Sequence, residues 1–448
     1  MSSLPCKQRL MNWGQFPVRS GRFYNFYSEY ELDKMWDDLT DGFIARGMGR
    51  CYGDGSLSAN VLSTVNYSHM LNLDEEKGIL VAESGITLRR LLNILIPKGW
   101  FLPVTPGTSY VTLGGAVAAD VHGKNHHCDG SFGRFVEWFD LRLPSGSVVR
   151  CSSVENSDLF YATIGGMGLT GLILSVAIKL LQIETSWIDQ KIFLANNLEE
   201  LMHLFDRHDS SKYSVAWVDC LNLENPGCGV FLSGRHVALD DIRQINCDPL
   251  STNLRPKLSI PFDLPNWVLN SWSVRQFNRL YAQIQAFNNG NRLVPLSNYF
   301  YPLDIIKNWN RMYGSQGFIQ YQCVLPVKES KDGLSKILQI IQQSGEGSFL
   351  AVLKKFGSLS SGGWLSFPME GFTLALDFPR RNSTEKLLKE IDNIVWDFNG
   401  RLYLAKDSRG PRNLFERSNK RWAEFKLLRD SIDPDRIIKS DLAARLGL

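Results

Sequence analysis

The sequence predicts an α+β protein with two domains, and three observations support this prediction. The chain has 448 residues, of which 44% are hydrophobic, so it can bury more than one core. Short elements separated by glycine-rich turns fill roughly the first 185 residues. From about Trp187 onward, longer amphipathic helices alternate with strands. A change of this kind predicts a second α+β domain.

The first part of the chain alternates strands with short helices. Residues 79–104 predict a strand, a helix capped by Thr87 and closed by Pro97 and Gly99, and a second strand. Apolar residues recur on one face of that helix: Leu88, Leu91, Leu92 and Leu95. Further along, the pattern predicts a hairpin, a short helix and a buried strand, in residues 136–150, 157–163 and 172–181.

The second part predicts longer elements. Helical spacing indicates helices, and apolar runs indicate strands. The helices are predicted at residues 198–205, 333–343 and 384–398, and the strands at residues 214–218, 318–324, 349–354 and 372–378. Residues 254–277 combine three prolines with several aromatic side chains and show no helical or strand period. We therefore predict that this segment is a loop with exposed apolar side chains.

Charge and hydropathy disfavour several classes of protein. Lys+Arg 49 and Asp+Glu 46 give a formal net charge of +3, too small for the basic surface of a nucleic-acid-binding protein. No apolar stretch reaches the ~18 residues of a membrane-spanning helix. The first 21 residues lack the apolar run of a secretion signal. We therefore expect a cytoplasmic protein with no nucleic-acid partner.

Four segments stand out as candidate binding loops, in residues 45–55, 106–116, 165–171 and 403–409. Closely spaced glycines in the first three let successive backbone N–H groups converge on a phosphate. The G-x-G-x-x-G fingerprint of nicotinamide-binding domains is not met, because Cys51 and Tyr52 follow Gly47-Met48-Gly49 without a helical pattern. Each segment alone is a weak signal, since glycine clusters more often mark turns than sites.

Taken together and in this order, these segments resemble the FAD-binding domain of the vanillyl-alcohol-oxidase-like flavoenzymes. More specific strings resemble the decaprenylphosphoryl-β-D-ribose oxidase family within that group. They are RCYGD at residues 50–54, VHGKNHH at 121–127, GSFG at 130–133, QYQ at 320–322 and AKDSR at 405–409. The resemblance extends from about residue 42 to SDLAARL at residues 440–446.

The resemblance implies a fold and a cofactor. An FAD-binding domain would consist of residues 1–185 and 401–448, and a substrate-binding domain of residues 186–400. Many relatives attach the flavin to a histidine in the first glycine loop. Here Met48, Gly49 and Arg50 occupy that stretch, and no histidine lies between residues 42 and 61. We therefore expect FAD to be bound noncovalently.

The resemblance also implies the site residues. The catalytic candidates are Lys406, His122 and Tyr52, and the substrate-binding candidates are Lys124, Gln320, Gln322, Lys354 and Ala375. The implied cofactor contacts are Arg46, Gly47, Met48, Gly49, Arg50, Cys51, Tyr52, Gly53, Pro106, Gly107, Thr108, Thr112, Gly114, Gly115, Ala118, His122, Gly123, Asn125, Gly168, Thr170, Gly171, Ile173 and Lys406.

Several alternatives concern these residues. The spacing of His122, His126 and His127 also suits a metal, but no acidic or thiol cluster accompanies it, so we expect no metal site. Surface histidines in a loop are a further interpretation of the same string. Ala375 stands where the mycobacterial enzymes have cysteine, and Thr373 where they have asparagine. Hydride transfer needs no thiol, so these departures bear on the fit of the substrate.

Enzymes of this family oxidise the 2-hydroxyl of a lipid-linked ribose on the way to the arabinose donor of cell-wall arabinan. The expected reaction is hydride transfer from the carbinol carbon to flavin N5, with Lys406 or His122 as the base. Oxygen or a quinone would reoxidise the flavin, and a partner reductase would complete the epimerisation of the keto sugar. A soluble alditol or aldonolactone oxidase of the same superfamily is an alternative, and a non-catalytic binding protein on this fold is another.

A polyprenyl substrate implies contact with a membrane surface. Residues 254–277 mix Phe262, Leu264, Trp267, Leu269 and Trp272 with basic side chains, among them Arg255, Lys257 and Arg275, and Arg279 follows closely. Such a mixture suits the headgroup boundary of a bilayer. We therefore expect peripheral attachment at the inner face of the plasma membrane. Packing of these apolar residues onto the second domain is the alternative.

Overall fold

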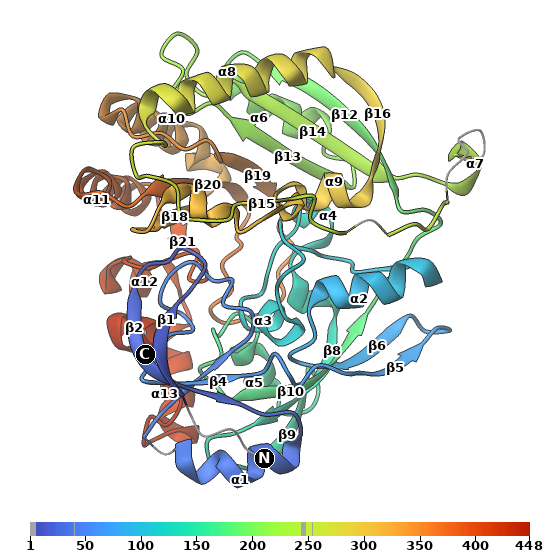
Figure 1. Cartoon of the computed structure of the whole chain (residues 1–448), viewed down its shortest axis with the longest axis vertical. Helices are drawn as coiled ribbons and strands as arrows, with labels where there is room; N and C mark the ends of the chain where they lie inside the picture. The colour runs from blue at the N-terminus through green and yellow to red at the C-terminus, as the bar shows by residue number, and fades with distance from the viewer. Residues whose placement is uncertain (1–5, 40, 243–247, 253) are drawn as a thin grey trace.

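A computed structural model describes residues 6–39, 41–242, 248–252 and 254–448 of the chain, and it confirms the predicted α+β class. Figure 1 shows the two small sheets of the first part below and one large sheet above them. The first described strand and the C-terminus both lie in the lower part. The large sheet is built from residues between Trp187 and Leu402.

Two sheets form the lower part. The N-terminal sheet has the order β1 (Cys6–Met11), β2 (Val18–Asn25), β4 (Asn60–Ser63), β3 (Ile44–Arg46). The central sheet has the order β5 (Met70–Asp74), β6 (Ile79–Glu83), β10 (Leu172–Lys179), β8 (Val136–Arg142), β9 (Val148–Ser152). The apolar run of β10 is buried at every position except Lys179, as a strand covered on both faces requires.

The large sheet is antiparallel throughout the described residues. Its order is β16 (Gly290–Pro295), β12 (Trp187–Ala195), β14 (Gly229–His236), β13 (Tyr213–Val218), β19 (Val352–Phe356), β20 (Gly371–Pro379), β18 (Phe318–Pro326), β21 (Arg401–Leu402). Because side chains alternate between the two faces of a strand, one face of this sheet can hold a core while the other faces a site.

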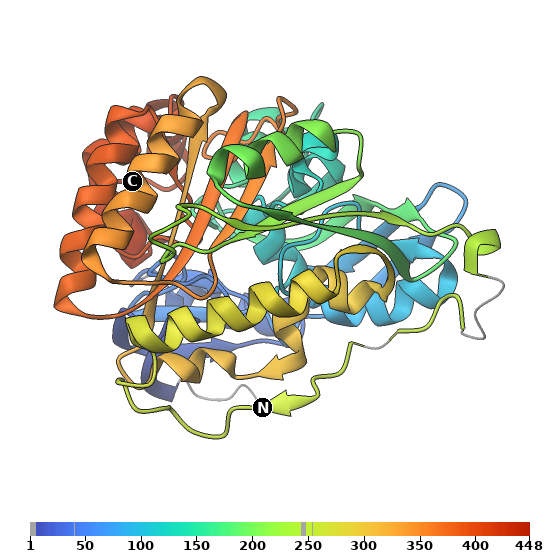
Figure 2. The same cartoon turned by 90° about the horizontal axis from the view of Figure 1, so that it is seen from above.

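Helices cover both faces of the large sheet. On one face, α6 (Leu198–Arg207), α10 (Val327–Ser344) and α11 (Asn382–Asp397) bury Leu201, Leu338 and Ile391 against the strands. On the other face, α8 (Ser271–Phe287) packs Tyr281 against Trp217 and Val230. In Figure 2 the yellow α8 runs along the lower side of the molecule, whereas the orange α10 and α11 stand at its left.

The remaining elements are short. The helices are α1 (Glu29–Trp36), α2 (Leu88–Leu95), α3 (Leu113–Ala118), α4 (His126–Asp129), α5 (Ser157–Thr163), α7 (Leu239–Ile242), α9 (Leu296–Phe300), α12 (Arg412–Ser418), α13 (Trp422–Ile432) and α14 (Asp441–Leu446). Two further strand pairs join β7 (Trp100–Phe101) to β11 (Leu181–Gln182) and β15 (Leu258–Ser259) to β17 (Ile306–Lys307).

Most predicted elements of the first part are confirmed. The Thr87 hydroxyl caps α2 by accepting a hydrogen bond from the Arg90 N–H, and Gly99 ends the following turn with φ +78°. The predicted hairpin is β8 with β9, whose turn contains Gly146 at φ +87°. The predicted helix at residues 157–163 is α5.

The prediction of a loop over residues 254–277 is wrong in its last part. Helix α8 begins at Ser271, because the Asn270 side chain accepts hydrogen bonds from the first N–H groups and the Ser273 hydroxyl completes a capping box. The buried face of α8 carries Val274 and Asn278 and continues beyond the segment, so a window ending at residue 277 hides its period.

The expected exposure of aromatic side chains in this segment holds for four residues, one of which is Phe277, 44% exposed. Phe262, Trp267 and Trp272 are 63%, 74% and 69% exposed. Leu264 and Leu269 are half-buried, and Leu254 is buried. Within the part of the chain that the structure describes, no helix is both long enough and apolar enough to cross a membrane.

Candidate active site

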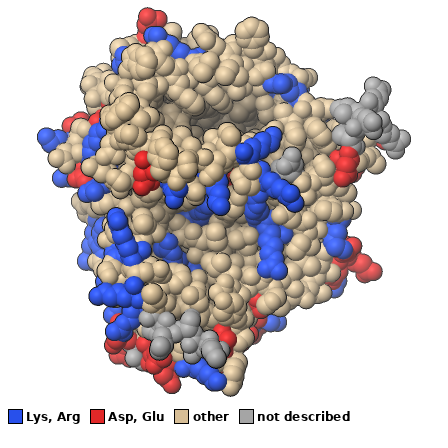
Figure 3. Space-filling view, viewed as in Figure 1, with Lys and Arg blue, Asp and Glu red and all other residues tan. Residues whose placement is uncertain are grey.

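A cavity of about 500 Å³ lies between the glycine-rich loops of the lower part and one face of the large sheet. One side of it is the glycine-loop wall, which we define as residues 45–56, 106–119 and 167–173 where they line the cavity. The opposite side is the sheet wall, made by lining residues of β13, β18, β19 and β20. Figure 3 shows this face hollowed beneath α8, with lysine and arginine side chains around the hollow.

The first loop of the glycine-loop wall follows β3. Gly49 has φ +61°, and an added Cβ at Gly47 would lie 2.2 Å from the Thr112 hydroxyl, so both positions require glycine. Among the described residues, the backbone N–H groups from Met48 to Cys51 have no hydrogen-bond acceptor. The loop therefore presents free donors to the cavity, as an anionic ligand requires.

The second loop precedes α3. The Thr108 hydroxyl donates to Asp304, which fixes the loop, whereas Gly107 has nothing within 4 Å of the position of an added Cβ. Its backbone can therefore approach a ligand closely. Free N–H groups, close backbone approach and a long cavity together fit a flavin dinucleotide, and the two loops would hold its phosphates.

Most of the expected cofactor contacts line the cavity. They are Arg46, Gly47, Met48, Gly49, Arg50, Cys51, Tyr52, Pro106, Gly107, Thr108, Thr112, Gly114, Gly115, Ala118, His122, Gly168, Gly171, Ile173 and Lys406. The structure does not place four others at the cavity surface, namely Gly53, Gly123, Asn125 and Thr170. Thr170, for example, is fully buried against the Thr163 hydroxyl, because glycine-rich turns also serve packing.

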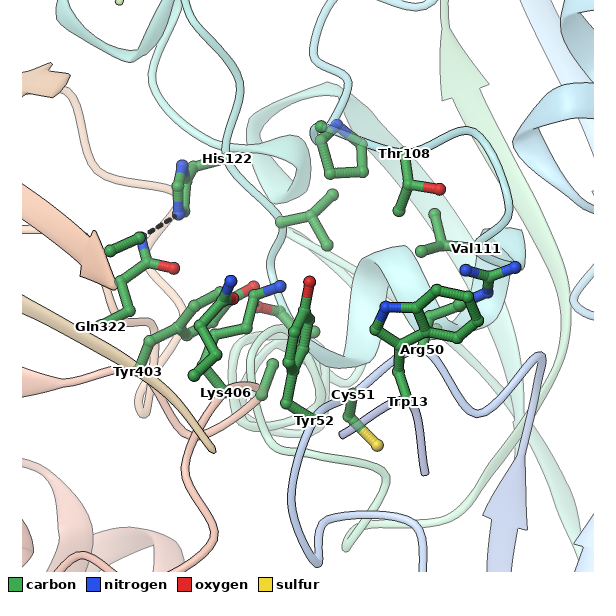
Figure 4. A pocket seen from close by; sticks show the side chains of 18 of the residues that line it. Trp13, Arg50, Cys51, Tyr52, Thr108, Val111, His122, Gln322, Tyr403 and Lys406 are labelled. Carbon is green, nitrogen blue, oxygen red and sulfur yellow. Dashed lines mark hydrogen bonds between the residues drawn. The ribbon is translucent and has the colours of Figure 1, made fainter. Parts of the chain in front are cut away.

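Lys406 and Tyr52 meet where the two walls join (Figure 4). The Lys406 ammonium group lies 3.8 Å from the centre of the Tyr52 ring. The Tyr52 N–H donates to the carbonyl of Ala405 at 3.0 Å, so the first glycine loop is bonded directly to the segment that carries Lys406. Asp377 of β20 lies nearby and accepts a hydrogen bond from the Gln320 amide.

His122 sits deeper and is held by the sheet wall. Its Nε2 lies 3.0 Å from the amide nitrogen of Gln322, which also donates to the Thr373 hydroxyl at 3.1 Å. An amide nitrogen can only donate, so Nε2 is the acceptor and the proton of the neutral ring is on Nδ1. That Nδ1 is buried without a partner among the described residues.

Burial shifts the acidities of this cluster. Burial lowers the pKa of Lys406, while Asp377 raises it, and the net shift is downward. Burial, together with Lys354, holds the pKa of His122 well below its usual range, so the ring is neutral. Burial and Asp377 raise the pKa of Tyr52 far above its usual value, so the phenol keeps its proton. Burial also raises the pKa of Asp377, so Lys406 and Asp377 are the two groups of this cluster that are suited to exchange a proton near neutral pH.

The expected substrate contacts Lys124, Gln320, Gln322, Lys354 and Ala375 all line the cavity. Lys124 donates to the carbonyl of Tyr299 and lies 4.3 Å from the centre of that ring. Thr373, Ala375 and Asp377 occupy every second position of β20, so their side chains lie on the same face of the sheet.

An apolar arm of the cavity extends from this cluster to α8. Phe277 and Tyr281 of α8 form one side, and Trp217 of β13 lies opposite, 4.8 Å from Tyr281 between ring centres. Other lining residues of this arm are Val215, Leu232, Phe349, Leu350 and Val352. The arm carries no charged side chain among these residues, so it suits a hydrocarbon ligand.

Arg445 of α14 links the loop that carries Tyr52 to the turn that carries Lys406, outside the cavity lining. Its guanidinium forms two hydrogen bonds with Asp54, at 2.8 and 2.9 Å, and one with Asp407 at 3.0 Å. Asp54 follows Tyr52 in the first glycine loop, and Asp407 follows Lys406. The last helix therefore fixes the distance between the Tyr52 loop and the Lys406 turn.

Sequence reasoning missed several residues of the cavity. Asp377 lies two positions from Ala375 on a strand, so the period of two could have identified it. Trp13, whose ring lies 3.7 Å from the Arg50 guanidinium carbon, precedes the recognisable motifs and gave no signal. The arm residues Trp217, Phe277 and Tyr281 come together only through the packing of α8 on the sheet.

Comparisons with known proteins agree with this geometry. A family model described as FAD binding domain matches residues 36–152. The chain is 35% identical over 414 residues to decaprenylphosphoryl-β-D-ribose oxidase of Mycolicibacterium smegmatis, covering 91% of this chain and 89% of the relative. It is 33% identical over 373 residues to an uncharacterized protein in the mprA 5′ region of Streptomyces coelicolor, covering 81% and 100%. With human Δ(24)-sterol reductase, identity is 29% over 157 residues, covering 35% and 30%.

Proposed function

Because the chain belongs to the decaprenylphosphoryl-β-D-ribose oxidase family and is an FAD-dependent oxidoreductase, we propose that it oxidises the 2-hydroxyl of a polyprenylphosphoryl ribose to the keto sugar. FAD, when bound, supplies the acceptor for the hydride that leaves the carbinol carbon, at flavin N5. The glycine-loop wall would hold FAD, and the sheet wall would hold the sugar. In domain terms, residues 1–185 and 401–448 would bind the cofactor and residues 186–400 the substrate.

One observation carries the choice of a lipid-linked substrate, namely the apolar arm under α8. A soluble alditol or lactone has no part that could fill a channel lined by Trp217, Phe277 and Tyr281. An isoprenoid chain could, and each CH₂ group buried there would contribute about 0.8 kcal/mol. The arm begins beside the polar cluster, so sugar and chain can be bound at the same time.

Lys406 acts as the base in this proposal. Its lowered pKa leaves a substantial fraction of the amine neutral near physiological pH, and the neutral amine can take the hydroxyl proton onto Nζ. His122 acts differently, because its Nε2 already accepts from Gln322 and its Nδ1 is buried. We therefore propose that His122 orients the flavin ring system. The phenol of Tyr52 stays protonated, so we propose that Tyr52 packs against its neighbours and donates a hydrogen bond.

Anaerobic reduction of the flavin tests the proposed function. The purified yellow protein should bleach with a farnesylphosphoryl ribose and stay yellow with xylitol, sorbitol or an aldonolactone. Bleaching by the soluble sugars alone would favour the alditol or aldonolactone oxidase, and absence of a yellow colour would favour a flavin-free binding protein. Reoxidation of the bleached enzyme by oxygen or by a soluble quinone would identify the acceptor class.

The attachment of FAD is a separate part of the proposal. Arg50 occupies the position at which a histidine would form a covalent link, and its side chain packs on Trp13. We therefore propose noncovalent FAD, which acid precipitation should leave in the supernatant. Yellow colour on the pellet would contradict this.

Contact with a membrane follows from the same substrate. The side of α8 that faces away from the sheet exposes Leu280 and Phe287, and Trp267 and Trp272 precede them. Basic residues are also exposed in this part of the chain, namely Arg255, Lys257 and, on α8 itself, Arg279. Since α8 also covers the apolar arm, a bilayer in contact with this surface would lie next to the arm's lining. We propose that it docks on anionic lipid at the cytoplasmic face, where a partner reductase would take up the keto sugar.

Co-sedimentation with vesicles of phosphatidylglycerol and phosphatidylcholine tests the docking surface. The wild type should bind, and a Trp267→Ser, Trp272→Ser variant should bind several-fold less. A Leu71→Ser variant is the matched control, because Leu71 is exposed on β5, far along the chain from α8. Equal binding by the wild type and the double variant, or no binding by the wild type, would contradict docking.

A further inference from the structure

Four half-buried side chains beside the two glycine loops form a stack in which aromatic rings and cations alternate. The Arg50 guanidinium carbon lies 3.7 Å from the centre of the Trp13 ring and 4.9 Å from the centre of the Tyr110 ring. The Arg89 guanidinium carbon lies 4.6 Å from the centre of the same Tyr110 ring. Cations attract the faces of aromatic rings, and partial shielding from water strengthens the attraction. We call Trp13, Arg50 and Tyr110 the clasp.

The Trp13 end of the clasp belongs to the turn between β1 and β2. The Trp13 N–H donates to the Cys51 carbonyl at 3.0 Å, and the buried Asn12 amide donates to the Gly53 carbonyl at 2.7 Å. The turn is therefore bonded to the first glycine loop along its length. The FAD binding domain model begins at residue 36, so the match to that model does not account for this turn or for Trp13.

The Tyr110 end of the clasp belongs to the second glycine loop. The Arg89 N–H of α2 donates to the Ser109 carbonyl at 2.9 Å. Asp304 accepts hydrogen bonds from the N–H and the hydroxyl of Ser109, both at 2.7 Å. The backbone beside Tyr110 is thus fixed from two sides. A ring on a fixed backbone loses little entropy when a cation stacks on it, so this half of the clasp is preorganised.

Rings hold Arg50 in place, and hydrogen bonds do not. Among the described residues, its guanidinium forms no hydrogen bond and no ion pair, so its five N–H donors are available to a ligand in the cavity that it lines. Arg46 in the same loop differs, because it donates to the Met11 carbonyl at 2.7 Å. Figure 4 shows Trp13 and Arg50 together, on the side of the view away from His122.

We propose that the clasp retains noncovalent FAD by holding the first glycine loop against the second. This inference rests on the noncovalent attachment proposed above and names the contacts that take the place of a covalent bond. Trp13 and Arg50 line the cavity, whereas Tyr110 is half-buried outside the described lining. The stack therefore runs from the lining of the cavity to the outer surface. Because both loops would hold the phosphates of FAD, release of FAD requires the loops to part and Arg50 to leave a ring.

The rate of FAD release tests the clasp, measured as the rise of flavin fluorescence after dilution of the holoenzyme. Tyr110→Leu removes one ring from Arg50 and should release FAD about tenfold faster than the wild type. Tyr110→Phe keeps the ring and should stay within twofold of the wild-type rate. The matched control is Trp138→Leu, because Trp138 is half-buried with Arg150 at 3.8 Å over its ring but lies outside the described lining. The control should release FAD at the wild-type rate.

A double-mutant cycle shows whether Tyr110 acts through Arg50. Arg50→Lys keeps the positive charge but loses the planar group that stacks on rings, so it should release FAD at least as fast as Tyr110→Leu. Tyr110→Leu should then add little in the Arg50→Lys background. Additive effects of the two substitutions would overturn the clasp. So would release at the wild-type rate by Tyr110→Leu, or equally fast release by Tyr110→Leu and Tyr110→Phe.

Trp13→Leu tests the other end of the stack. This variant should also release FAD about tenfold faster. Trp13 additionally packs edge-on against Trp309, with 5.6 Å between ring centres, so the variants of Tyr110 provide the test if Trp13→Leu does not fold. Release at the wild-type rate by a folded Trp13→Leu would overturn the clasp as defined here.

These measurements use no sugar substrate, so they separate this inference from the proposed function. If Tyr110→Leu releases FAD as expected while farnesylphosphoryl ribose leaves the flavin oxidised, the clasp stands and the proposed oxidation is wrong. If the ribose is oxidised while Tyr110→Leu and the wild type release FAD equally slowly, the proposed oxidation stands and the clasp is wrong. Yellow colour on the pellet after acid precipitation would overturn both the noncovalent attachment and the clasp.

Discussion

The two walls of the cavity are built from different chemical groups. The glycine-loop wall presents backbone N–H groups together with Arg46 and Arg50, whereas the sheet wall presents side chains of its strands, among them Gln320, Gln322 and Lys354. The first arrangement suits a ligand that does not change from one turnover to the next. The second allows a substrate to be selected by individual side chains. Substitutions in the glycine-loop wall should therefore have their effect by changing its shape. Substitutions in the sheet wall should have their effect by removing a charge or a hydrogen bond.

The largest effect is expected at the junction of the walls. Lys406→Met removes the proposed base and should lower the rate of flavin reduction by about 10² to 10⁴-fold. FAD content should stay near that of the wild type, because the glycine-loop wall is unchanged. Anaerobic stopped-flow absorbance measures both quantities. A rate within twofold of the wild type would mean that the sheet wall performs the chemistry without this residue.

The next largest effect is a loss of stability expected when Arg445 no longer links the Tyr52 loop to the Lys406 turn. Arg445→Met leaves the carboxylates of Asp54 and Asp407 buried without their cation, which typically costs about 3 to 5 kcal/mol. Urea unfolding should show this loss. The control Lys426→Met removes an exposed helical pair with Asp430 and should change stability little. If both variants unfold at the same denaturant concentration, Arg445 does not hold the site together.

A smaller effect tests whether the packing of the first glycine loop against the Lys406 segment acts through shape. Gly53→Ala places a Cβ 1.9 Å from the Asp407 carbonyl, so backbone must move, at a cost of about 1 to 3 kcal/mol. Both stability and FAD content should fall. Gly107→Ala meets nothing within 4 Å and should destabilise the protein much less. Full FAD content and unchanged stability in Gly53→Ala would show that this contact tolerates a methyl group.

The smallest effect is a dependence of stability on pH that arises in the sheet wall. Lys354 has a pKa lowered to about 8 in the folded chain, against 10.5 ordinarily, so the unfolded chain binds more protons between these values. Above pH 10.5 Lys354 is neutral in both states and its burial costs no stability. As the pH falls toward 8, the unfolded chain takes up a proton and the free energy of unfolding decreases. Lys124 and Lys406 act in the same direction.

The difference between the wild type and Lys354→Met isolates this group. From pH 8 to 9.5, the free energy of unfolding of the wild type should rise relative to that of the variant. A constant difference across this range would show that the Lys354 ammonium is well solvated in the folded protein. Values above pH 9.5 are better avoided, because tyrosines begin to titrate in the unfolded chain.

Local patterns predicted the glycine-loop wall better than the sheet wall. Turn glycines, the Thr87 cap and the Lys406 segment are visible in short stretches of sequence, and the structure places most of them as expected. Helix α8 was not predicted, because the prolines before it obscure its start and its buried face extends beyond residue 277. Asp377, Trp13 and the apolar arm depend on contacts between elements distant in sequence, and no local period encodes such contacts.

The bond from Arg445 to Asp54 and Asp407 also orders events during synthesis of the protein. The first glycine loop leaves the ribosome early, but the guanidinium that fixes it emerges only after residue 445 has been translated. Until then the carboxylates of Asp54 and Asp407, behind the cavity, lack their cation, and the Tyr52 loop is not fixed against the Lys406 turn. We therefore expect the pocket to reach its final shape only after this helix has been translated.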